Sequence, residues 1–472
     1  MITLLDAALS RQQLKARMPF RYGIATMTEV PHVFLQLTFD FDGTTGKGVS
    51  ADHLPPKWFT KDPDRDLDEE IEEMFLVLRT AVKHARAISA ATPFAFWREL
   101  YAAQAKWGEA NNIPPLLAQF GVTLVERAMI DAYCHAHYTT LETALHKNLF
   151  GIELGAIHDS LADSQPGDWL PAEAPREVFA RHTVGLSDPL TDDEIPDEDR
   201  VADVLPQSLT ACIRFYGMRH FKLKINGETA RDQERLARMA QIFATECGSD
   251  YAFSLDGNEC FHEVATFKNY VGELQAKVGD ADFWSKLLFI EQPWHRNVAL
   301  SPEIGELAAA WPDRPPIIID ESDAELTSLP TALKLGYAGT SHKNCKGIFK
   351  GVANACLLAQ RRSQGLPAMM SGEDLSNVAP VAVLQDLAAQ ACLGITSVER
   401  NGHHYFAGLT QFPAALQNAM LTNHADLFTK EVTGWPRLDV REGHINLGTV
   451  LSAPFGYAGE LDLSGLAKET LD

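Results

Sequence analysis

The chain has 472 residues, 46% of them hydrophobic, which is too long for one ordinary domain and favours two, one of them large enough to be a barrel. Its 41 basic and 63 acidic side chains give a net charge of −22, which argues against nucleic acid and anionic membranes as partners. Seven widely spaced cysteines, a polar N-terminus and the lack of any apolar run of about 18 residues predict a reduced, cytoplasmic, globular protein.

The N-terminal third of the chain predicts an α+β domain over residues 1–160. Residues 33–41 (VFLQLTFDF) alternate between apolar and polar side chains, as a half-exposed strand does. Long helical patterns follow at 67–88 and 115–137. We therefore expect a small domain of its own before the second, larger one.

From about residue 179, β-rich runs alternate with amphipathic helical stretches. We expect strands at 178–184, 220–225, 251–255, 287–290, 316–319, 340–342, 367–370 and 395–398. Eight alternations of strand and helix are typical of a parallel barrel, whose active site lies at the C-terminal ends of the strands. This α/β barrel is expected to span 161–410, and 411–472 to return to the first domain.

The second expected strand, HFKLKIN, carries two lysines that lie two residues apart. Because strand side chains alternate between faces, Lys222 and Lys224 point the same way. Burying two like charges is costly without carboxylates or a metal beside them, and their mutual repulsion lowers the pKa of at least one, which suits a general base. The alternative interpretation is a solvent-exposed pair on an edge strand. Residues elsewhere in the chain distinguish these two interpretations.

Each of the next three strands ends in a carboxylate, namely Asp256, Glu291 and Asp320. Strand ends meet at the mouth of a parallel barrel, where three carboxylates repel one another unless a hard cation neutralises them, and oxygen ligands suit Mg²⁺. A single Asp after a strand is more often a helix cap, but three in succession beside two lysines favour a metal site. Asn258 and Glu321 could support these ligands or contact the substrate.

The sixth strand ends in the motif HKNCK. A barrel places its second and sixth strands on opposite sides, so we expect Lys343 to face Lys222 and Lys224 across the metal. Two bases on opposite faces of a substrate suit the removal and return of a proton. Lys346 is the competing candidate for this position, and His342 should point away from the site.

The Lys-x-Lys pair, the three strand-end carboxylates and the opposing lysine, in this order, resemble the enolase superfamily. Within it, the chain is most similar to the mandelate racemase/muconate-lactonizing enzyme type, closest to the muconate-lactonizing group. The resemblance implies a modified TIM barrel, (β/α)7β, with an α+β capping domain formed by the N-terminal region and the C-terminal segment. It also implies a homo-oligomer.

The same resemblance implies a mechanism. In that family Mg²⁺ binds a substrate carboxylate and stabilises the enediolate that forms when a lysine removes the α-proton, a role that concentrated positive charge can fill. Lys224 would be the base, Lys222 would tune it, and Lys343 would be the base or acid on the other face.

The chain also departs from relatives of that type. The mandelate racemase branch pairs a His on the seventh strand with an Asp on the sixth, whereas here the sixth strand carries Lys343 and the seventh ends near Glu373, so a His/Asp dyad is not expected. Glu373 and Glu399 lie where substrate contacts are expected, with structural hydrogen bonding as the alternative. His403 and His404 could line the site or bind a second metal, although adjacent histidines usually point apart.

Loops of the capping domain supply the remaining candidates for covering the barrel mouth. Arg21, Tyr22, His53 and Lys57 lie in such loops, with exposed surface positions as the competing interpretation for each. Of these, Tyr22 and His53 could contact a substrate or support the residues that do.

The sequence thus predicts a Mg²⁺-dependent isomerase that abstracts the α-proton of a small-molecule carboxylate, giving racemisation, epimerisation or cycloisomerisation. A lyase that dehydrates an acid sugar or hydroxy acid with the same residues is the close alternative. A Schiff-base aldolase would also use a barrel lysine but has no need of the three carboxylates. A catalytically inert barrel that acts as a binding protein would show no affinity for Mg²⁺.

Overall fold

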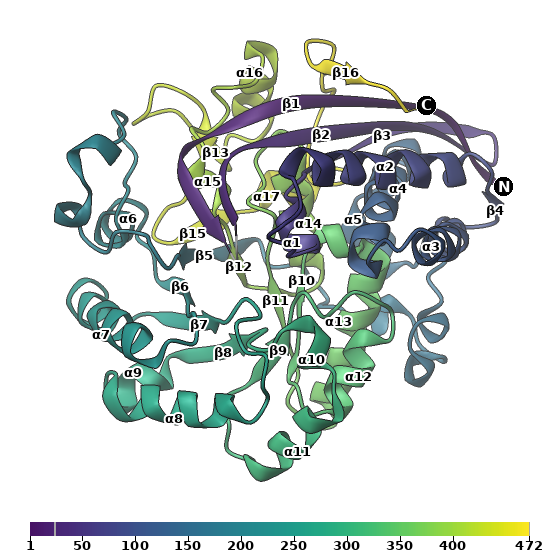
Figure 1. Cartoon of the computed structure of the whole chain (residues 1–472). Coiled ribbons are helices and arrows are strands. Elements are labelled where there is room, and N and C mark those ends of the chain that lie inside the picture. Colours follow the sequence, from purple (N-terminus) through teal and green to yellow (C-terminus); the bar gives the residue numbers. More distant parts are fainter. Residues whose placement is uncertain (23–24, 472) are drawn as a thin grey trace.

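A parallel barrel dominates the computed structural model, which describes residues 1–22 and 25–471, the side chains of Tyr22 and Ala25 excepted (Figure 1). Among the described residues the barrel strands are β5 (Glu177–Val184), β6 (His220–Lys224), β7 (Ala252–Asp256), β8 (Leu287–Glu291), β9 (Ile317–Ile319), β10 (Gly339–His342), β11 (Met369–Gly372) and β12 (Ser397–Glu399). Each pairs in parallel with the next, and β12 closes the barrel on β5. Every predicted strand is confirmed in order, with its ends shifted by a few residues.

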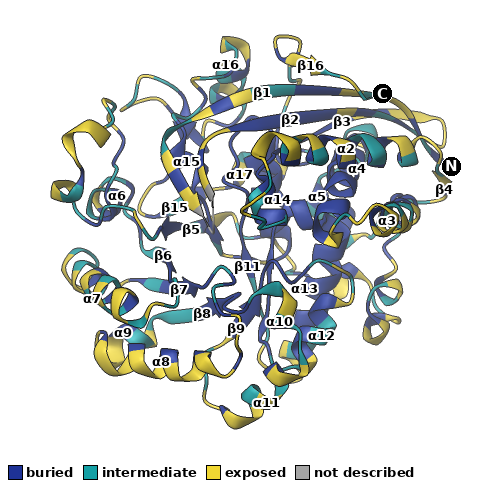
Figure 2. Cartoon of the chain, in the orientation of Figure 1, coloured by how far each residue is buried: buried dark blue, intermediate teal, exposed yellow. Residues whose placement is uncertain are grey.

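Helices follow the strands of this barrel, and most of them bury an apolar face against its outside. They are α6 (Leu209–Tyr216), α7 (Thr229–Glu246), α8 (Thr266–Lys277), α9 (Ala281–Ser285), α10 (Arg296–Ala299), α11 (Pro302–Ala310), α12 (Ser328–Lys334), α13 (Ile348–Ser363), α14 (Ala382–Cys392) and α15 (Gly402–Tyr405). In β6, Phe221 stacks on Phe243 of α7, with ring centroids 4.4 Å apart, so the alternate residues Lys222 and Lys224 point into the barrel. Figure 2 shows the resulting pattern, with buried strands and the exposed outer sides of α8 and α11.

An antiparallel sheet precedes the barrel and lies over it. Its strands are β1 (Ile2–Tyr22), β2 (Ala25–Phe41) and β3 (Thr44–His53), with the short β4 (Ser89–Ala90) on β1. The helices of this region are α1 (Pro56–Phe59), α2 (Leu67–Ala85), α3 (Pro93–Ala110), α4 (Pro115–Ala136) and α5 (Leu141–His146). The strand expected at 33–41 and the helices expected at 67–88 and 115–137 are confirmed. A Cβ atom at Gly48 of β3 would lie 2.2 Å from the Ala128 carbonyl oxygen, so glycine is what lets α4 pack directly on the sheet.

The C-terminal segment contacts both parts of the molecule. It contains α16 (Ala414–Asn423), β13 (Phe428–Thr429), β14 (Arg437–Leu438), β15 (His444–Asn446), α17 (Gly448–Ser452) and β16 (Ala467–Glu469). β15 pairs antiparallel with β5 of the barrel, and β16 pairs antiparallel with β1 of the N-terminal sheet. The expected return of this segment is therefore observed, although it also extends the barrel sheet, and the boundaries at 160 and 410 stay a prediction.

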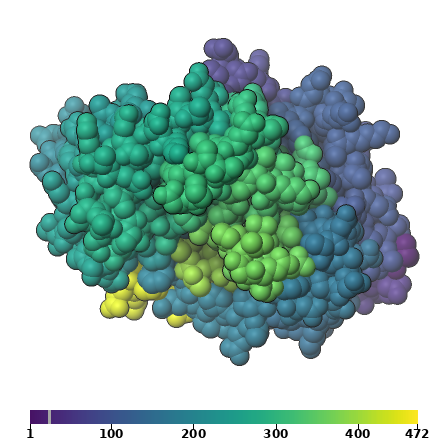
Figure 3. All heavy atoms as spheres, turned by 90° about the horizontal axis from the view of Figure 1, so that it is seen from below, coloured from purple at the N-terminus to yellow at the C-terminus, as the bar shows by residue number. Residues whose placement is uncertain are grey.

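Seen from below, teal and green residues of the barrel helices form most of one face, and purple and blue residues of the N-terminal third lie along its side (Figure 3). Within the described part of the chain, no helix has both the length and the apolar content needed to cross a membrane.

Candidate active site

Lys222 lies at the centre of the barrel mouth, surrounded by carboxylates. Its Nζ is 2.8 to 3.0 Å from oxygens of Asp256, Glu291, Glu373 and Glu399. Burial disfavours the charged ammonium, but the four carboxylates outweigh that effect and hold the pKa of Lys222 well above its usual value. Lys222 is therefore not the lysine whose pKa repulsion within the pair would lower, because the carboxylates outnumber the lysines beside it.

Lys224 lies two residues further along β6, closer to the opening of the barrel mouth. Its Nζ donates to Asp256 Oδ2 and to Asn258 Oδ1, both at 2.5 Å. Lys224 lines the central cavity together with Asn258. Of the two lysines it is the one with fewer carboxylate partners, and Asn258 holds its ammonium group from the side.

Three buried carboxylates come together in the arrangement that a metal ion needs. Oxygens of Glu291, Asp320 and Glu373 lie within 4.8 Å of one another. Glu291 Oε2 is buried and has no hydrogen-bond partner among the described residues. Burial, followed by the neighbouring Glu373 charge, raises the pKa of Glu291 well above its usual value, so an added cation would stabilise its charged form. This all-oxygen donor set fits a hard divalent cation such as Mg²⁺.

This group differs in one member from the ligands that the sequence predicts. Asp256 occupies the predicted strand end, but its carboxylate contacts Lys222 at 2.9 Å and Lys224 at 2.5 Å. Those two ammonium groups outweigh its burial and hold the pKa of Asp256 below its usual value. Glu373, predicted as a substrate contact or a structural hydrogen-bonding residue, lies in the carboxylate group instead.

The lysine of the sixth strand faces the same cavity. Lys343 Nζ lies 2.7 Å from Asp320 Oδ2 and 2.7 Å from Glu373 Oε2, and 4.9 Å from the ring centre of Trp58. Burial opposes its charge, but these two carboxylates hold the pKa of Lys343 well above its usual value. Lys346, the competing candidate, does not line the cavity and donates to the Asp320 and Ser341 carbonyl oxygens.

The remaining predicted residues of this strand region have structural contacts. His342 points away from the site and lies 3.1 Å from Asn344 Oδ1 through its Nε2. Glu321 is buried and lies 3.5 Å from Lys61, and burial raises the pKa of Glu321 to about 7. Asn258 Nδ2 reaches Glu321 Oε1 at 3.4 Å, so Glu321 lies behind the cavity wall.

The first strand contributes residues that sequence reasoning missed. Arg181 of β5 is buried and donates to Ser371 Oγ at 2.6 Å and to Glu373 Oε1 at 3.3 Å. Thr183 donates to Glu399, which also accepts from Asn401 Nδ2 at 2.8 Å. Glu373 and Glu399 therefore line the cavity and take part in structural hydrogen bonds at once. Strand alternation alone could have indicated the inward direction of Arg181.

The capping domain closes the mouth above these residues. The cavity has a volume of about 60 Å³, and from the capping domain it is lined by Phe20, Met27, Pro55 and Trp58. Two hydrogen bonds connect this part of the capping domain to the barrel. Lys61 Nζ donates to the Asn258 carbonyl oxygen at 2.7 Å, and Arg296 Nη1 donates to the Phe59 carbonyl oxygen at 2.6 Å.

The four predicted capping residues have other positions. His53 is buried, with its Nδ1 3.0 Å from His32 Nδ1 and its Nε2 3.2 Å from the Ser376 carbonyl oxygen, and it does not line the cavity. Lys57 binds carbonyl oxygens of its own loop, and the exposed Arg21 donates to Ser187 Oγ at 2.9 Å. The side chain of Tyr22 lies outside the described part of the structure.

No family model and no curated protein matches this sequence, but solved structures match it over nearly its whole length. A member of the enolase superfamily from Listeria innocua Clip11262 is 14% identical, with a TM-score of 0.63 over 100% of this chain and 98% of that one. A dipeptide epimerase from Cytophaga hutchinsonii, solved with Mg and the dipeptide D-Ala-L-Val, is 15% identical, with a TM-score of 0.58 over 99% of both chains.

A muconate lactonizing enzyme from Pseudomonas fluorescens, solved with muconolactone, is 16% identical, with a TM-score of 0.58 over 97% of both chains. At these identities the likeness concerns the fold. The chain therefore has the modified TIM barrel with a capping domain that is found in the enolase superfamily.

Proposed function

We propose that the chain is an enzyme of the enolase superfamily, of the mandelate racemase/muconate-lactonizing type, which removes the α-proton of a small carboxylate substrate to give an enediolate. The observation that carries the proposal is the meeting of Lys222, Lys224 and Lys343 with a group of buried carboxylates around one cavity. A carbon acid beside a carboxylate is very weakly acidic, so its deprotonation needs a positioned base and concentrated positive charge.

Mg²⁺ is the proposed cofactor. When bound, it would supply positive charge for the oxygens of the substrate carboxylate. Glu291 and Asp320 would hold it, and the third ligand would be Asp256, as the sequence predicts, or Glu373, which lies closer to the other two. Magnesium in the structure of the dipeptide epimerase from Cytophaga hutchinsonii supports this choice of metal.

The positions of the three lysines indicate a different role in proton transfer for each. Lys224 lines the cavity and has fewer carboxylate partners than Lys222, so it is the proposed base. Lys222 is held by four carboxylates and stabilises the developing negative charge without leaving its place. Lys343 reaches the cavity from the sixth strand and is the proposed partner that returns a proton to the substrate. Trp58 and Phe20 exclude water from above.

Isomerase chemistry is the preferred outcome, because lysines from two different strands can serve the two sides of a planar intermediate. The names of the similar proteins, a dipeptide epimerase and a muconate lactonizing enzyme, support the same class. A lyase reaction, in which Lys343 protonates a leaving hydroxyl of an acid sugar or hydroxy acid, is the alternative that uses the same residues.

Exchange of the substrate α-proton with solvent tests the proposal, because every outcome shares this half-reaction. The protein would be incubated with Mg²⁺ in D₂O with N-acyl amino acids, dipeptides, hydroxy acids and acid sugars, and deuterium incorporation followed by NMR. The expected result is exchange with one of these classes, and a loss of about 10²- to 10⁴-fold in a Lys224→Ala variant. The exposed Lys106 provides the matched control, Lys106→Ala, which should keep full exchange.

Three results would count against the proposal. Unchanged exchange in the Lys224→Ala variant would remove Lys224 as the base. Absence of exchange across all substrate classes, together with a lack of Mg²⁺ binding, would favour an inert barrel that only binds a ligand. Trapping of a substrate by borohydride, with activity that survives chelation, would indicate a Schiff-base aldolase.

A further inference from the structure

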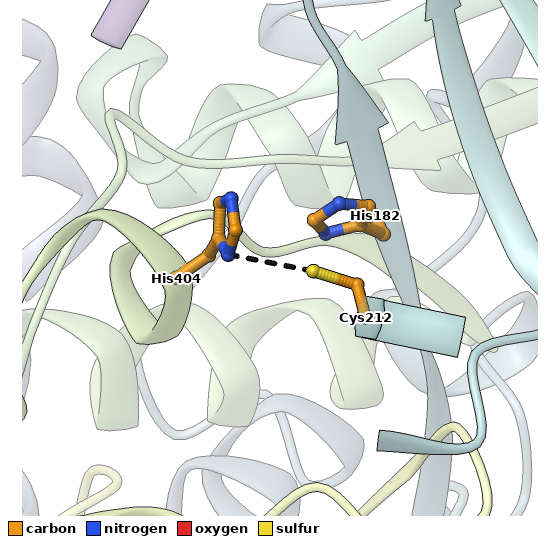
Figure 4. A group of neighbouring side chains, drawn as sticks. All are labelled: His182, Cys212 and His404. Carbon is orange, nitrogen blue, oxygen red and sulfur yellow. Dashed lines mark hydrogen bonds between the residues drawn. The ribbon is translucent and has the colours of Figure 1, made fainter. Parts of the chain in front are cut away.

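A second cluster of metal-binding side chains lies outside the barrel wall, away from the carboxylates. It consists of His182 of β5, Cys212 of α6 and His404 of α15, all of them buried. One potential ligand atom from each residue lies within 4.8 Å of those of the other two. Figure 4 shows the three side chains pointing toward one another from three separate elements.

The position of His182 separates this cluster from the catalytic cavity. Its neighbours in β5, Arg181 and Thr183, both contact carboxylates of the active site, Arg181 through Glu373 and Thr183 through Glu399. Alternation along the strand brings His182 into contact with the surrounding helices, where its ring lies 5.0 Å from that of His404. None of the three residues lines the catalytic cavity.

The geometry of the cluster suits tetrahedral coordination. Zinc bonds of about 2.3 Å to sulfur and about 2.0 to 2.1 Å to nitrogen place two such ligands about 3.6 Å apart at a tetrahedral angle. The observed distance between Cys212 Sγ and His404 Nδ1 is 3.6 Å. Ring nitrogens bound to the same zinc put the two ring centres about 5 Å apart. His182 and His404 match this distance, with ring centroids 5.0 Å apart.

An unpaired polar atom independently indicates that the cluster lacks a partner. His182 is 3% exposed, and its Nδ1 is buried without a hydrogen-bond partner in the described part of the chain. Native proteins rarely leave such a group without a hydrogen bond or a ligand. Imidazole coordinates metals in its neutral form, through a ring nitrogen that carries no proton.

We propose that His182, Cys212 and His404 bind a Zn²⁺ ion, with a water molecule in the fourth tetrahedral position. A mixed set of sulfur and imidazole donors favours zinc, whereas the all-oxygen group in the barrel mouth favours Mg²⁺, so the two sites would take different metals. The metal would enter in exchange for the proton of the Cys212 thiol, which goes to solvent.

The ion would connect elements at the place where the last barrel strand, β12, pairs with the first, β5. His182 lies on the first strand of the barrel, and His404 lies on α15, directly after the last strand, β12. The His404 carbonyl oxygen also accepts from Arg17 Nη1 at 3.0 Å, and Arg17 belongs to the capping strand β1. One bound ion would thus fix the first strand, the segment after Glu399 and the capping domain relative to one another.

Metal analysis of the purified protein tests the proposal without any substrate. The protein would be expressed with zinc, purified without chelators and analysed by mass spectrometry of its metals. The expected result is one zinc per chain in the wild type and its loss in Cys212→Ser and His404→Ala. Cys392 is likewise a free, buried cysteine but lies outside the cluster, so Cys392→Ser should keep the zinc. A Glu291→Gln variant should also keep it, which excludes zinc held by the active-site carboxylates.

Cobalt substitution provides a readout that does not depend on the folding of any variant. Removing zinc from the wild type and adding Co²⁺ should produce a thiolate-to-cobalt charge-transfer band in the near ultraviolet and lower-energy bands typical of tetrahedral cobalt. Removal of zinc should also lower the melting temperature of the wild type and of Cys392→Ser.

Two results would overturn the proposal. One is wild-type protein that contains no zinc and takes up Co²⁺ without a thiolate band. The other is equal zinc in folded Cys212→Ser and Cys392→Ser. Either result would leave a buried thiol that only contacts two histidines, and neither depends on whether the barrel mouth catalyses proton exchange.

Discussion

Lys222 and Glu373 form a buried ion pair at the centre of the barrel, with 2.9 Å between Nζ and Oε2. The same oxygen of Glu373 lies 2.7 Å from Lys343 Nζ, and its other oxygen accepts from Arg181 at 3.3 Å. Burial disfavours the charge of Glu373, but Lys222 and Lys343 outweigh it and hold the pKa of this carboxyl well below its usual value. The negative charge of Glu373 is thus shared by positively charged side chains from three strands.

Replacing Glu373 with Gln should therefore destabilise the whole protein. The variant removes the negative charge and leaves Lys222, Lys343 and Arg181 buried with less compensation, which costs about 3 to 5 kcal/mol for a broken buried pair. Denaturant unfolding should show this loss in the free energy of unfolding. The exposed Glu263 supplies the control, since Glu263→Gln should change stability by less than about 0.5 kcal/mol. Equal stability of the two variants would show that the pair contributes little.

The barrel and its inward lysines were predictable because both depend on local patterns. Alternation along β6 sets the direction of Lys222 and Lys224, and apolar strand cores followed by carboxylates locate Asp256, Glu291 and Asp320 at the mouth. Which carboxylates then meet depends on the stagger between strands that are distant in sequence, so the partnership of Glu373 with Lys222 had no sequence signal.

The capping residues above the cavity and the cluster of His182, Cys212 and His404 were harder to predict, because both depend on contacts between elements that are distant in sequence. Trp58 lies in the short helix α1, whose position is fixed by contacts of Lys61 and Arg296 between the capping domain and the barrel, and such contacts decide it more than local propensity does. His182 and Cys212 are 30 residues apart and both lie far from His404, so no ligand spacing marks them as a group. The sequence marks the adjacent His403 and His404 as candidates for a second metal site. Only the folded chain shows that His182 and Cys212 lie beside His404.

Glu291 should be indispensable for binding Mg²⁺. It belongs both to the ligand set predicted from sequence and to the carboxylates that the structure brings together, and its Oε2 has no hydrogen-bond partner among the described residues. Calorimetric titration of Mg²⁺ should give binding with the wild type and none detectable with Glu291→Gln. Full affinity in Glu291→Gln would place the metal elsewhere.

The same titration distinguishes the two candidates for the third ligand. Asp256→Asn and Glu373→Gln would be compared under matched conditions, with circular dichroism as the check that each variant is folded. The variant whose affinity falls as far as that of Glu291→Gln identifies the ligand. The other carboxylate then serves the lysines, as Asp256 does through its contacts with Lys222 and Lys224.

Asp131 should make the stability of the protein depend on pH. It is buried in α4, where it accepts from the Val49 amide at 2.8 Å and from the Tyr457 hydroxyl at 2.7 Å. Burial outweighs these hydrogen bonds and raises the pKa of Asp131 from 3.8 to about 8. Because the folded state holds this proton more tightly than the unfolded state, its contribution to stability is fully present below about pH 4 and is lost as the pH rises through about 8.

An Asp131→Asn variant removes this titration and keeps an oxygen that can accept both hydrogen bonds. The melting temperature of the variant relative to the wild type should therefore rise between about pH 4 and about pH 8, the window set by the two pKa values. The exposed Asp163 provides the control, since Asp163→Asn should follow the wild type across the range. A difference between Asp131→Asn and wild type that stays constant with pH would contradict the assignment.

Trp58 should matter for turnover because it closes the cavity directly above Lys343. Its ring centre lies 4.9 Å from Lys343 Nζ, and Arg296 Nη2 holds its carbonyl oxygen at 3.1 Å, so the backbone of α1 stays in place when the side chain is shortened. A Trp58→Ala variant admits water to the site and removes a cation–π contact of about 2 kcal/mol, which corresponds to a loss of about 30-fold in kcat/KM for proton exchange.

A Trp58→Phe variant keeps an aromatic face over Lys343 and should recover most of this loss. If Trp58 only filled space, the two variants would instead differ in melting temperature and share the same kcat/KM, which deuterium exchange measured across substrate concentrations would reveal. A fall in kcat with unchanged KM would indicate that the ring acts mainly by excluding water during proton transfer, because substrate binding alone would then be unaffected.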